Sequence, residues 1–412
     1  MTVLPSTTPG SGGPLRVLYV NPFSQAISGP DESLLELLKA LVPLGVQPHV
    51  VLPHPGPQVS RFEERGAVVH FVPLSILKRR VSPYALGKLS INLVRGTRTL
   101  FDVIRKEQIQ LVHTNMEVVL DAGIAAKLAR IPHVMHYRGN TLDEPRLLFD
   151  ALTLAWVKTS GRILCISRST ADIFVKRGHG NHIQVVYNPV NTQALSLASR
   201  SEGMRSQFGA SPTDLLVGAI GRIHPRKDLT TFLRAAAAVI AREPRARFVV
   251  VGGAEAPEEH AYRADLENLV TELGLANRLT WAGVRRDIPS VLKALDVMVL
   301  SSRHEGFGRV VAEAMAAGTP VVASREGAMP ELIQDGVSGL LANPGDSAEF
   351  ATCICRLLET EELRSSIGAA AKRAARLFSP ELVAGQVLET YRHLLGLPSY
   401  PQEAKASSRS LQ

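Results

Sequence analysis

Two glutamates, Glu305 and Glu313, lie eight residues apart in the stretch EGFGRVVAEAMAAGTP at 305–320. Gly306, Phe307 and Gly308 precede its helix-forming part. Backbone N–H groups at the start of a helix lack internal partners and lie at its positive end, so these three residues can hold a phosphate. Glu313 is expected about two turns into the helix, where its carboxylate can accept both hydroxyls of a ribose. The pattern predicts a nucleotide site; the alternative is a surface helix that carries two acids.

A second chemical element lies in DLLVGAIGRIHPRKDLTTFLRAAAAVI at 214–240, which has the pattern of a buried strand, a loop and a helix. The loop after Gly221 contains Arg222 and Lys227. Arg presents a planar fork and Lys a point charge, and both suit a diphosphate. The alternative is that these cations are only solvated, as loop cations often are. A phosphate-binding role is favoured because this spacing occurs together with the first motif.

Both motifs resemble the signatures of glycosyltransferase family 4, a family of retaining enzymes with the GT-B fold. The resemblance implies that Glu305 contacts the donor sugar and Glu313 the ribose. It assigns the donor pyrophosphate to Arg222 and Lys227. It also implies retention of the anomeric configuration, with the donor phosphate helping to remove the acceptor proton, so no protein nucleophile is assigned.

Further donor contacts are expected from the loop that follows the first strand and from WAGVRRD at 281–287. In the first loop, Gly29 and Pro30 stand at the turn into a helix, with Ser28 or Gly29 as its cap. The family commonly has two glycines there, and Pro30 takes the place of the second without an N–H to offer a phosphate. The loop is therefore expected either to hold the phosphate less fully or to serve acceptor recognition instead. In the other segment, Val284 and Arg285 are expected near the base.

In the N-terminal half, His136 follows an apolar strand, and family members have a His in a similar place that contacts the transferred sugar. A structural role is the alternative for a lone His at a strand end. Arg138 and Asn140 come just after it, and His113 has a similar placement with weaker support. We expect these three on the acceptor side. The stretch VYNPVN at 186–191 departs from the family's Asn-Gly-Val-Asp, which weakens the transfer of detail there.

Short apolar strands alternate with longer amphipathic helices, which is typical of α/β folds with parallel sheets. At 412 residues the chain is longer than a single hydrophobic core normally supports, so two domains are expected. The resemblance implies that these are two Rossmann-like domains facing a central cleft. The strands are expected at 15–20, 48–52, 67–72, 110–113, 133–137, 162–166, 183–187, 215–220, 246–251, 278–282, 296–300, 319–323 and 338–341.

The expected domain organisation follows from these elements and from the polar stretches between them. It comprises a disordered tail (1–14), an acceptor-binding domain (15–190), a linker (191–213), a nucleotide-sugar-binding domain (214–377), a helix crossing back to the N-terminal domain (378–397) and a second disordered tail (398–412).

Most of the net charge of +8 lies in residues 75–106, which hold eight Lys and Arg residues against one acid, Asp102. Apolar residues follow a helical repeat from Leu86 to Ile104, and the cations group on another side. Such a helix can lie against anionic lipid, or it can pack on the core with a solvated outer face. Both alternatives stay open. Nucleic acid is disfavoured because no aromatic platform accompanies the charge.

The sequence therefore predicts a glycosyltransferase that moves a sugar from a UDP- or GDP-linked donor to a glycan or lipid-linked acceptor, in cell-surface polysaccharide or glycolipid biosynthesis. No cofactor is expected, and metal independence is predicted because Asp-x-Asp is absent from the sequence. We expect a cytoplasmic enzyme, with peripheral association at the inner membrane face as an alternative, since no apolar run approaches the ~18 residues of a membrane span.

Three other functions are alternatives for such a chain. A dehydrogenase would need a Gly-x-Gly-x-x-Gly fingerprint after the first strand, which the sequence lacks. A GT-B sugar-nucleotide epimerase would bind the same donor without consuming an acceptor. A non-catalytic, membrane-associated scaffold that has kept nucleotide binding is the third.

Overall fold

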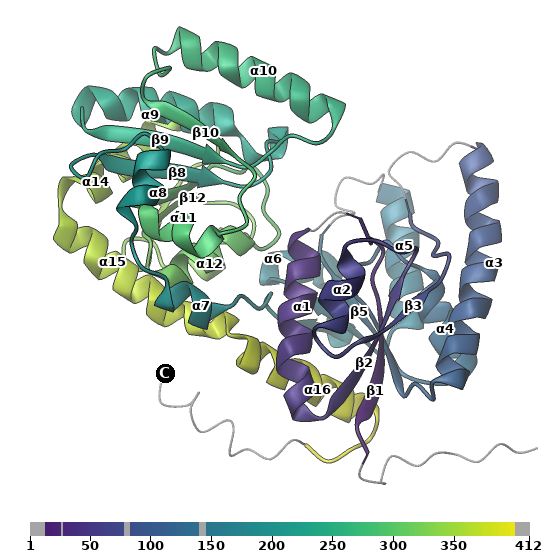
Figure 1. Cartoon of the computed structure of the whole chain (residues 1–412). Coiled ribbons are helices and arrows are strands. Elements are labelled where there is room, and N and C mark those ends of the chain that lie inside the picture. The colour runs from purple at the N-terminus through teal and green to yellow at the C-terminus, as the bar shows by residue number, and fades with distance from the viewer. Residues whose placement is uncertain (1–12, 26–27, 78–82, 140–145, 400–412) are drawn as a thin grey trace, which may run out of the picture. The chain divides into compact units, whose positions relative to one another are not determined.

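The computed structural model describes residues 13–25, 28–77, 83–139 and 146–399. The chain divides into two compact units, one formed by Met1–Pro189 with Pro380–Gln412 and the other by Val190–Ser379. Each unit is built on a parallel sheet with helices on both faces (Figure 1). The two terminal segments predicted as tails fall almost wholly outside the described residues.

The sheet of the first unit has the strand order β3-β2-β1-β4-β5-β6-β7. Its strands are β1 (Leu15–Val20), β2 (Val46–Leu52), β3 (Val68–Phe71), β4 (Leu111–Thr114), β5 (His133–Tyr137), β6 (Arg162–Cys165) and β7 (Ile183–Val185). Its helices are α1 (Gly29–Leu41), α2 (Gln58–Glu63), α3 (Pro83–Lys106), α4 (Asp121–Ala129), α5 (Arg146–Thr159), α6 (Arg168–Val175) and α16 (Pro380–Leu394).

Alternation along β1 explains why this sheet is covered on both faces. Val17 and Tyr19 pack in one cluster with residues of α1 and α16, whereas Leu18 and Val20 pack in another with residues of α3 and α4. Successive side chains of a strand point to opposite faces, so a strand buried on both sides is apolar throughout. Helix α16 is anchored through Tyr391, whose hydroxyl lies 2.5 Å from Nδ1 of His113.

The sheet of the second unit has the order β10-β9-β8-β11-β12-β13, the same as that of the first six strands of the first unit. Its strands are β8 (Leu215–Ile220), β9 (Ala246–Val251), β10 (Leu279–Gly283), β11 (Val297–Leu300), β12 (Val321–Ser324) and β13 (Leu340–Ala342). Its helices are α7 (Thr192–Leu197), α8 (Glu202–Gln207), α9 (Leu229–Arg242), α10 (Pro257–Glu272), α11 (Ile288–Ala294), α12 (Arg309–Ala317), α13 (Met329–Leu332), α14 (Ser347–Glu359) and α15 (Glu361–Ala374).

The structure confirms the α/β class and the two parallel sheets, and each expected strand has a counterpart within the described residues. Strand ends differ by up to a few residues. The second strand begins at Val46 and so includes Pro48. Pro48 pairs with Val17 of β1, whereas the pairing of β2 with β3 begins one residue later, at His49. A proline is tolerated there because its missing N–H faces no partner strand. The segment expected as a linker, 191–213, holds α7 and α8 and belongs to the second unit.

Candidate functional site

The strand order of each sheet reverses direction at one point, and this point locates a binding site. Connections run one way from β1 and the other way from β4, and the same reversal occurs between the adjacent strands β8 and β11. In open α/β sheets, ligands bind outside the carboxyl ends of the strands at such a switch point. The residues that follow these four strands are therefore the candidates in each unit.

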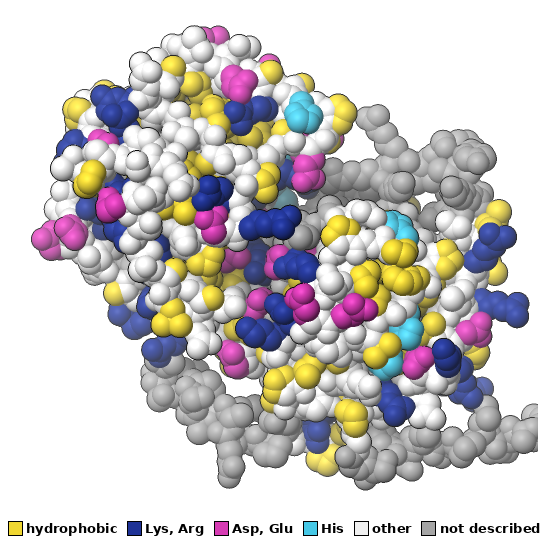
Figure 2. Space-filling view, viewed as in Figure 1, with side chains coloured by type: hydrophobic (Ala, Val, Ile, Leu, Met, Phe, Trp, Pro, Cys, Tyr) yellow, Lys and Arg dark blue, Asp and Glu magenta, His cyan; other side chains and the backbone are white. Residues whose placement is uncertain are grey.

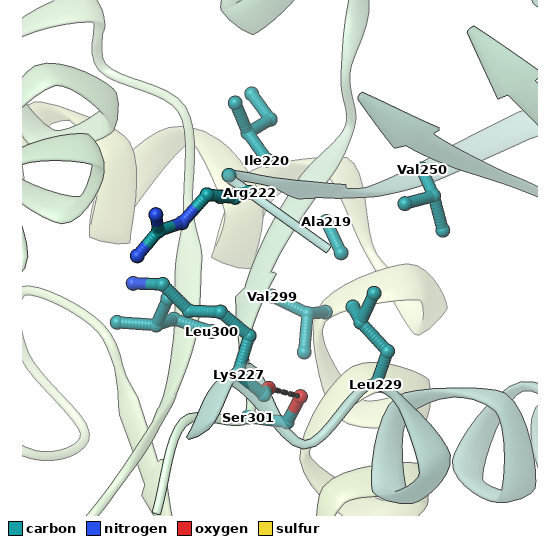
Figure 3. Close-up of a pocket in the computed structure, with 10 residues that line it drawn as sticks. Ala219, Ile220, Arg222, Lys227, Leu229, Val250, Val299, Leu300 and Ser301 are labelled. Carbon is teal, nitrogen blue, oxygen red and sulfur yellow. Dashed lines mark hydrogen bonds between the residues drawn. The ribbon is translucent and has the colours of Figure 1, made fainter. Parts of the chain in front are cut away.

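Arg222 and Lys227 lie at the switch point of the second unit. Arg222 follows β8, and Lys227 ends a short 3-10 helix at Pro225–Lys227. Figure 3 shows their charged groups directed to the same side, to the left of a pocket lined by both residues and by Gly221 and Ser301. The Ser301 hydroxyl donates to the backbone carbonyl oxygens of Lys227 (3.0 Å) and Asp228 (2.9 Å), which ties the loop after β8 to the end of β11.

Each of the two cations is paired with a carboxylate. Lys227 Nζ lies 2.6 Å from Oε2 of Glu305, and both side chains are mostly buried. Arg222 is exposed, and its Nε lies 3.2 Å from Oε1 of the buried Glu259 on α10. Charge-assisted contacts of this length hold the cations in place. The predicted pyrophosphate and sugar residues, Lys227 and Glu305, are thus in direct contact.

The loop that carries Glu305 is held by close backbone contacts. The Ala328 N–H donates to the Glu305 carbonyl at 3.0 Å. Gly327 has φ +60°, and a Cβ there would lie 2.1 Å from the same carbonyl oxygen. Phe307 is buried edge-on against Phe378, with ring centroids 5.5 Å apart. Gly327 therefore permits a backbone approach that fixes the position of Glu305.

Helix α12 begins at Arg309, with Gly308 in the left-handed conformation as its N-cap. Gly306, Phe307 and Gly308 thus lead directly into the helix, as predicted. Glu313 lies about one turn from the helix start, so the expected two turns were wrong, because the glycines delay the first helical residue. Glu313 Oε1 accepts from Arg309 Nε at 2.8 Å, four residues earlier on the same helix.

Val284 and Arg285 follow β10, at the carboxyl edge of the same sheet. Val284 is 71% exposed, which leaves an apolar surface that a base can cover. Arg285 is engaged with the protein: its Nη2 lies 2.7 Å from Asp287 Oδ2, and its Nη1 donates to Gln207 Oε1 at 3.2 Å.

At the switch point of the first unit, Asn21 follows β1 and Asn115 follows β4. Asn115 Nδ2 donates to Asn21 Oδ1, and Asn21 Nδ2 donates to Asp31 Oδ1, both at 2.9 Å. The other oxygen of Asp31 accepts from the N–H and the hydroxyl of Ser28, the N-cap of α1. Gly29, predicted to bind the donor, is the first residue of α1 and is positioned by this network.

Arg138 extends the network across the sheet. Its Nη2 donates to Asn115 Oδ1 at 2.6 Å, and its Nη1 donates to the side-chain oxygen of Asn188, just beyond β7. Its backbone N–H donates to Glu117 Oε2 at 2.9 Å. The side chain is buried and each guanidinium nitrogen donates a hydrogen bond, the third running from Nε to the Asn115 carbonyl at 3.1 Å, which favours a positioning role over direct acceptor contact. Asn140 lies outside the described residues.

His113 and His136 lie on neighbouring strands, with stacked rings whose centroids are 5.4 Å apart. Both are buried, and burial together with the charge of Arg138 lowers the pKa of each ring well below its usual range. Neither nitrogen of His136 makes a well-formed hydrogen bond within the described residues. His136 is therefore neutral at ordinary pH and can exchange a hydrogen bond, not a charge, with a ligand.

Asn21, Asn115 and Glu259 were not predicted from the sequence. A signal existed for the two asparagines, because each comes just after a strand predicted at the switch point. Glu259 had no comparable signal, since its partner Arg222 lies 37 residues earlier on a different element.

Comparison with known protein families agrees with this geometry. Residues 27–194 match the model for Glycosyltransferase Family 4, and residues 214–360 match that for Glycosyl transferases group 1. These two matches cover most of both units. The chain belongs to glycosyltransferase family 4 and has the α/β architecture of the GT-B fold.

Two curated relatives illustrate the activities in this group. UDP-Gal:alpha-D-GlcNAc-diphosphoundecaprenol alpha-1,3-galactosyltransferase of Escherichia coli is 25% identical over 80% of this chain and 87% of its own length. D-inositol 3-phosphate glycosyltransferase of Mycobacterium marinum is 34% identical, but over 54% of this chain and 48% of its own length. This chain thus spans about half of the second relative.

Solved structures show the same fold. Anabaena Alr3699/HepE in complex with UDP is 25% identical, with a TM-score of 0.78 over 92% of this chain and 100% of its own. The same protein has been solved with UDP-glucose, with a TM-score of 0.77. Sucrose-phosphate synthase from Thermosynechococcus elongatus, at 19% identity and a TM-score of 0.72, shares the fold.

Proposed function

We propose that this glycosyltransferase transfers a sugar from a UDP-sugar to a lipid-linked acceptor, with retention of the anomeric configuration. The observation that carries the proposal is the pair Arg222 and Lys227, directed to one side at the β8–β11 switch point (Figure 3). Cleavage of a sugar–phosphate bond leaves a nucleoside diphosphate, and stabilising its growing charge is the main demand on the protein.

The donor assignment rests on the site and on the relatives. Two cations and the N–H groups at 306–308 would meet the diphosphate, and Glu313 would accept the ribose hydroxyls. Glu305, in contact with Lys227, would bind the sugar next to the bond that breaks. UDP is favoured over GDP because the Escherichia coli relative is named for UDP-Gal and the Anabaena protein was solved with UDP-glucose.

The acceptor and the setting are inferred from the same relatives. The Escherichia coli enzyme acts on a diphosphoundecaprenol-linked sugar, so a lipid-linked acceptor in cell-surface polysaccharide or glycolipid synthesis is proposed. An enzyme that uses such an acceptor must bind at a membrane surface. The cations of residues 75–106 could bind the anionic lipids of that surface. Within the described residues, no helix is long and apolar enough to cross a bilayer.

The mechanism proposed needs no protein nucleophile. The departing phosphate would take the acceptor proton on the same face of the sugar, and the cations would hold the charge without a metal ion. In the first unit, His136 is neutral and buried, with Arg138 fixed beside it. His136 would therefore position the sugar through hydrogen bonds, while His113 and Arg138 shape its surroundings.

The test is release of free UDP from UDP-sugars, measured with and without a lipid-linked acceptor. We expect release only with acceptor, which distinguishes a transferase from an epimerase or a scaffold. Lys227→Ala should reduce release roughly 100- to 1000-fold, as for other lost contacts to transition-state charge. Arg325→Ala, which removes an exposed ion pair with Asp335 in the same unit, is the matched control and should keep full activity. Full activity in Lys227→Ala would refute the assignment.

A further inference from the structure

An apolar groove of about 550 Å³ runs between α3 and α4 on the outside of the first unit. Its walls are Leu93, Val94, Thr97, Arg98 and Phe101 from α3, and Ile124 and Leu128 from α4. The size is that of a small-molecule site, as is the mixture of many apolar side chains with a few polar ones. None of these residues belongs to the site described above.

The rim of the groove is unusually apolar for a surface. Val94 is 70% exposed, Leu128 is 62% exposed, and Ile91, one turn before Val94 on the helix, is 56% exposed. Single exposed apolar residues are ordinary, but a cluster around a groove marks an interaction site. Other α3 residues, such as Leu100 and Ile104, are buried in the core, so the same helix is apolar on two sides.

Cations lie on both sides of this groove. Arg95 and Arg98 are exposed on α3, and Lys127 and Arg130 are exposed at the end of α4. None of the four forms an ion pair within the described residues, and Asp102 is the only exposed acid on that part of α3. Figure 2 shows Lys and Arg side chains interspersed with hydrophobic ones along this edge of the first unit.

We propose that this groove binds a hydrocarbon chain of an anionic membrane phospholipid, whose phosphate lies against the flanking cations. An apolar chain fits the walls, and a phosphate fits unpaired Arg and Lys side chains. The cations flank the groove itself, so the head group belongs beside it and not at the strand ends where the sugar would be transferred. A second copy of this chain is disfavoured, since a two-fold contact would bring like charges together.

The inference rests on the proposed function only in that a lipid-linked acceptor requires a membrane. The partner of the basic segment 75–106 is then an anionic phospholipid, and α4 contributes to its site together with α3. Lipid binding to the groove requires neither a donor nor transfer. A failure here therefore leaves the transferase proposal standing, and loss of transfer in Lys227→Ala leaves lipid binding intact.

The experiment is co-sedimentation of the full chain with vesicles of phosphatidylcholine containing phosphatidylglycerol, compared with phosphatidylcholine alone. Wild type should partition to the anionic vesicles, and added salt should weaken it. Arg95→Gln with Arg98→Gln should lower the partition coefficient roughly 30-fold, from about fivefold for each cation. Val94→Ser with Leu128→Ser should lower it about tenfold or more.

The matched control is Val175→Ser with Lys176→Gln, an exposed apolar residue and an exposed cation at the end of α6 in the same unit. This control should bind as wild type does and should retain UDP affinity, as should both groove variants. Equal binding of wild type to both kinds of vesicle would overturn the proposal. So would unchanged binding in the Val94→Ser, Leu128→Ser variant.

Occupation of the groove by a chain is tested separately with Leu128→Trp. Phosphatidylglycerol with brominated acyl chains should quench the added fluorescence, while wild type, with Trp156 and Trp281 only, sets the baseline. Absence of added quenching would contradict a chain in the groove. Light scattering without lipid measures whether the groove instead binds a second copy of the chain. A wild-type dimer that dissociates in the Val94→Ser, Leu128→Ser variant would assign the groove to that second copy and overturn the lipid proposal.

Discussion

At the scale of single residues, the site in the second unit consists of cations already paired with carboxylates. Lys227 with Glu305 and Arg222 with Glu259 form contacts of 2.6 and 3.2 Å. A diphosphate that enters must share or replace these partners. Glu305 orients Lys227, and in the proposed donor complex it would lie next to the sugar that the diphosphate carries.

Glu313 gives a prediction at this scale. Because a carboxylate accepts ribose hydroxyls strongly, wild type should bind UDP roughly 10- to 100-fold more tightly than 2′-deoxy-UDP. Glu313→Gln should lose most of that preference while remaining folded, since the broken pair with Arg309 is an intrahelical one worth only about 0.5 kcal/mol. Calorimetric titration measures both affinities. Glu359→Gln, an exposed acid in the same unit, is the control, and an unchanged preference in Glu313→Gln would exclude the ribose role.

Gly327 gives a second prediction at the scale of single residues. Gly327→Ala should lower the free energy of unfolding by about 2 kcal/mol or more, because its Cβ would meet the Glu305 carbonyl at a left-handed backbone position. Gly336→Ala is the matched control, with φ +77° and no atom within 4 Å of the added Cβ, so it should cost roughly 1 kcal/mol from strain alone. Urea unfolding compares the two. Equal losses would show that the close approach does not constrain the Glu305 loop.

At the scale of elements, a buried carboxylate at the start of α4 packs closely against α3. Asp121, the first residue of α4, accepts from the Ser75 N–H at 2.7 Å, and its Oδ2 would lie 2.3 Å from a Cβ added to Gly96 of α3. Its other oxygen has no partner within the described residues. Burial raises the pKa of Asp121 to about 6.

This pKa sets a pH dependence of stability. Because the folded pKa, about 6, exceeds the ordinary value of 3.8, Asp121 stabilises the fold when protonated, and this contribution is lost as pH rises from about 4 to about 6. In wild type, the free energy of unfolding should fall by about 3 kcal/mol across this pH range because of Asp121, and Asp121→Asn should remove that fall. Urea unfolding across this window, compared with wild type and with exposed Asp102→Asn, measures the difference. Parallel profiles for wild type and Asp121→Asn would rule out the titration.

The elements themselves were predictable because their signals are local. Apolar runs such as 15–20 and 215–220 became central strands, and the glycines at 306 and 308 did precede a helix. The site contacts were less accessible. Lys227 and Glu305 are 78 residues apart, and the partners of Arg138 come from the ends of two strands, β4 and β7. Sequence spacing does not report which strand ends become neighbours; the switch-point rule does, once the strand order is known.

At the scale of the molecule, the two units repeat one strand order and so present two switch points. One carries cations and carboxylates, and the other carries a buried network of asparagines and Arg138 with neutral histidines beside it. This division of charge suits an anionic donor in the second unit. On the proposed function, the first unit would supply shape, hydrogen bonds and, through α3 and α4, contact with lipid.

The central claim is that the second unit holds a nucleotide sugar by its diphosphate. The most direct measurement is calorimetric titration of the full chain with UDP and with uridine. Wild type should bind UDP roughly 100-fold or more tightly than uridine, and Lys227→Ala should lower that ratio at least about tenfold without changing uridine binding. Equal affinities of wild type for UDP and uridine, or an unchanged ratio in Lys227→Ala, would contradict the account.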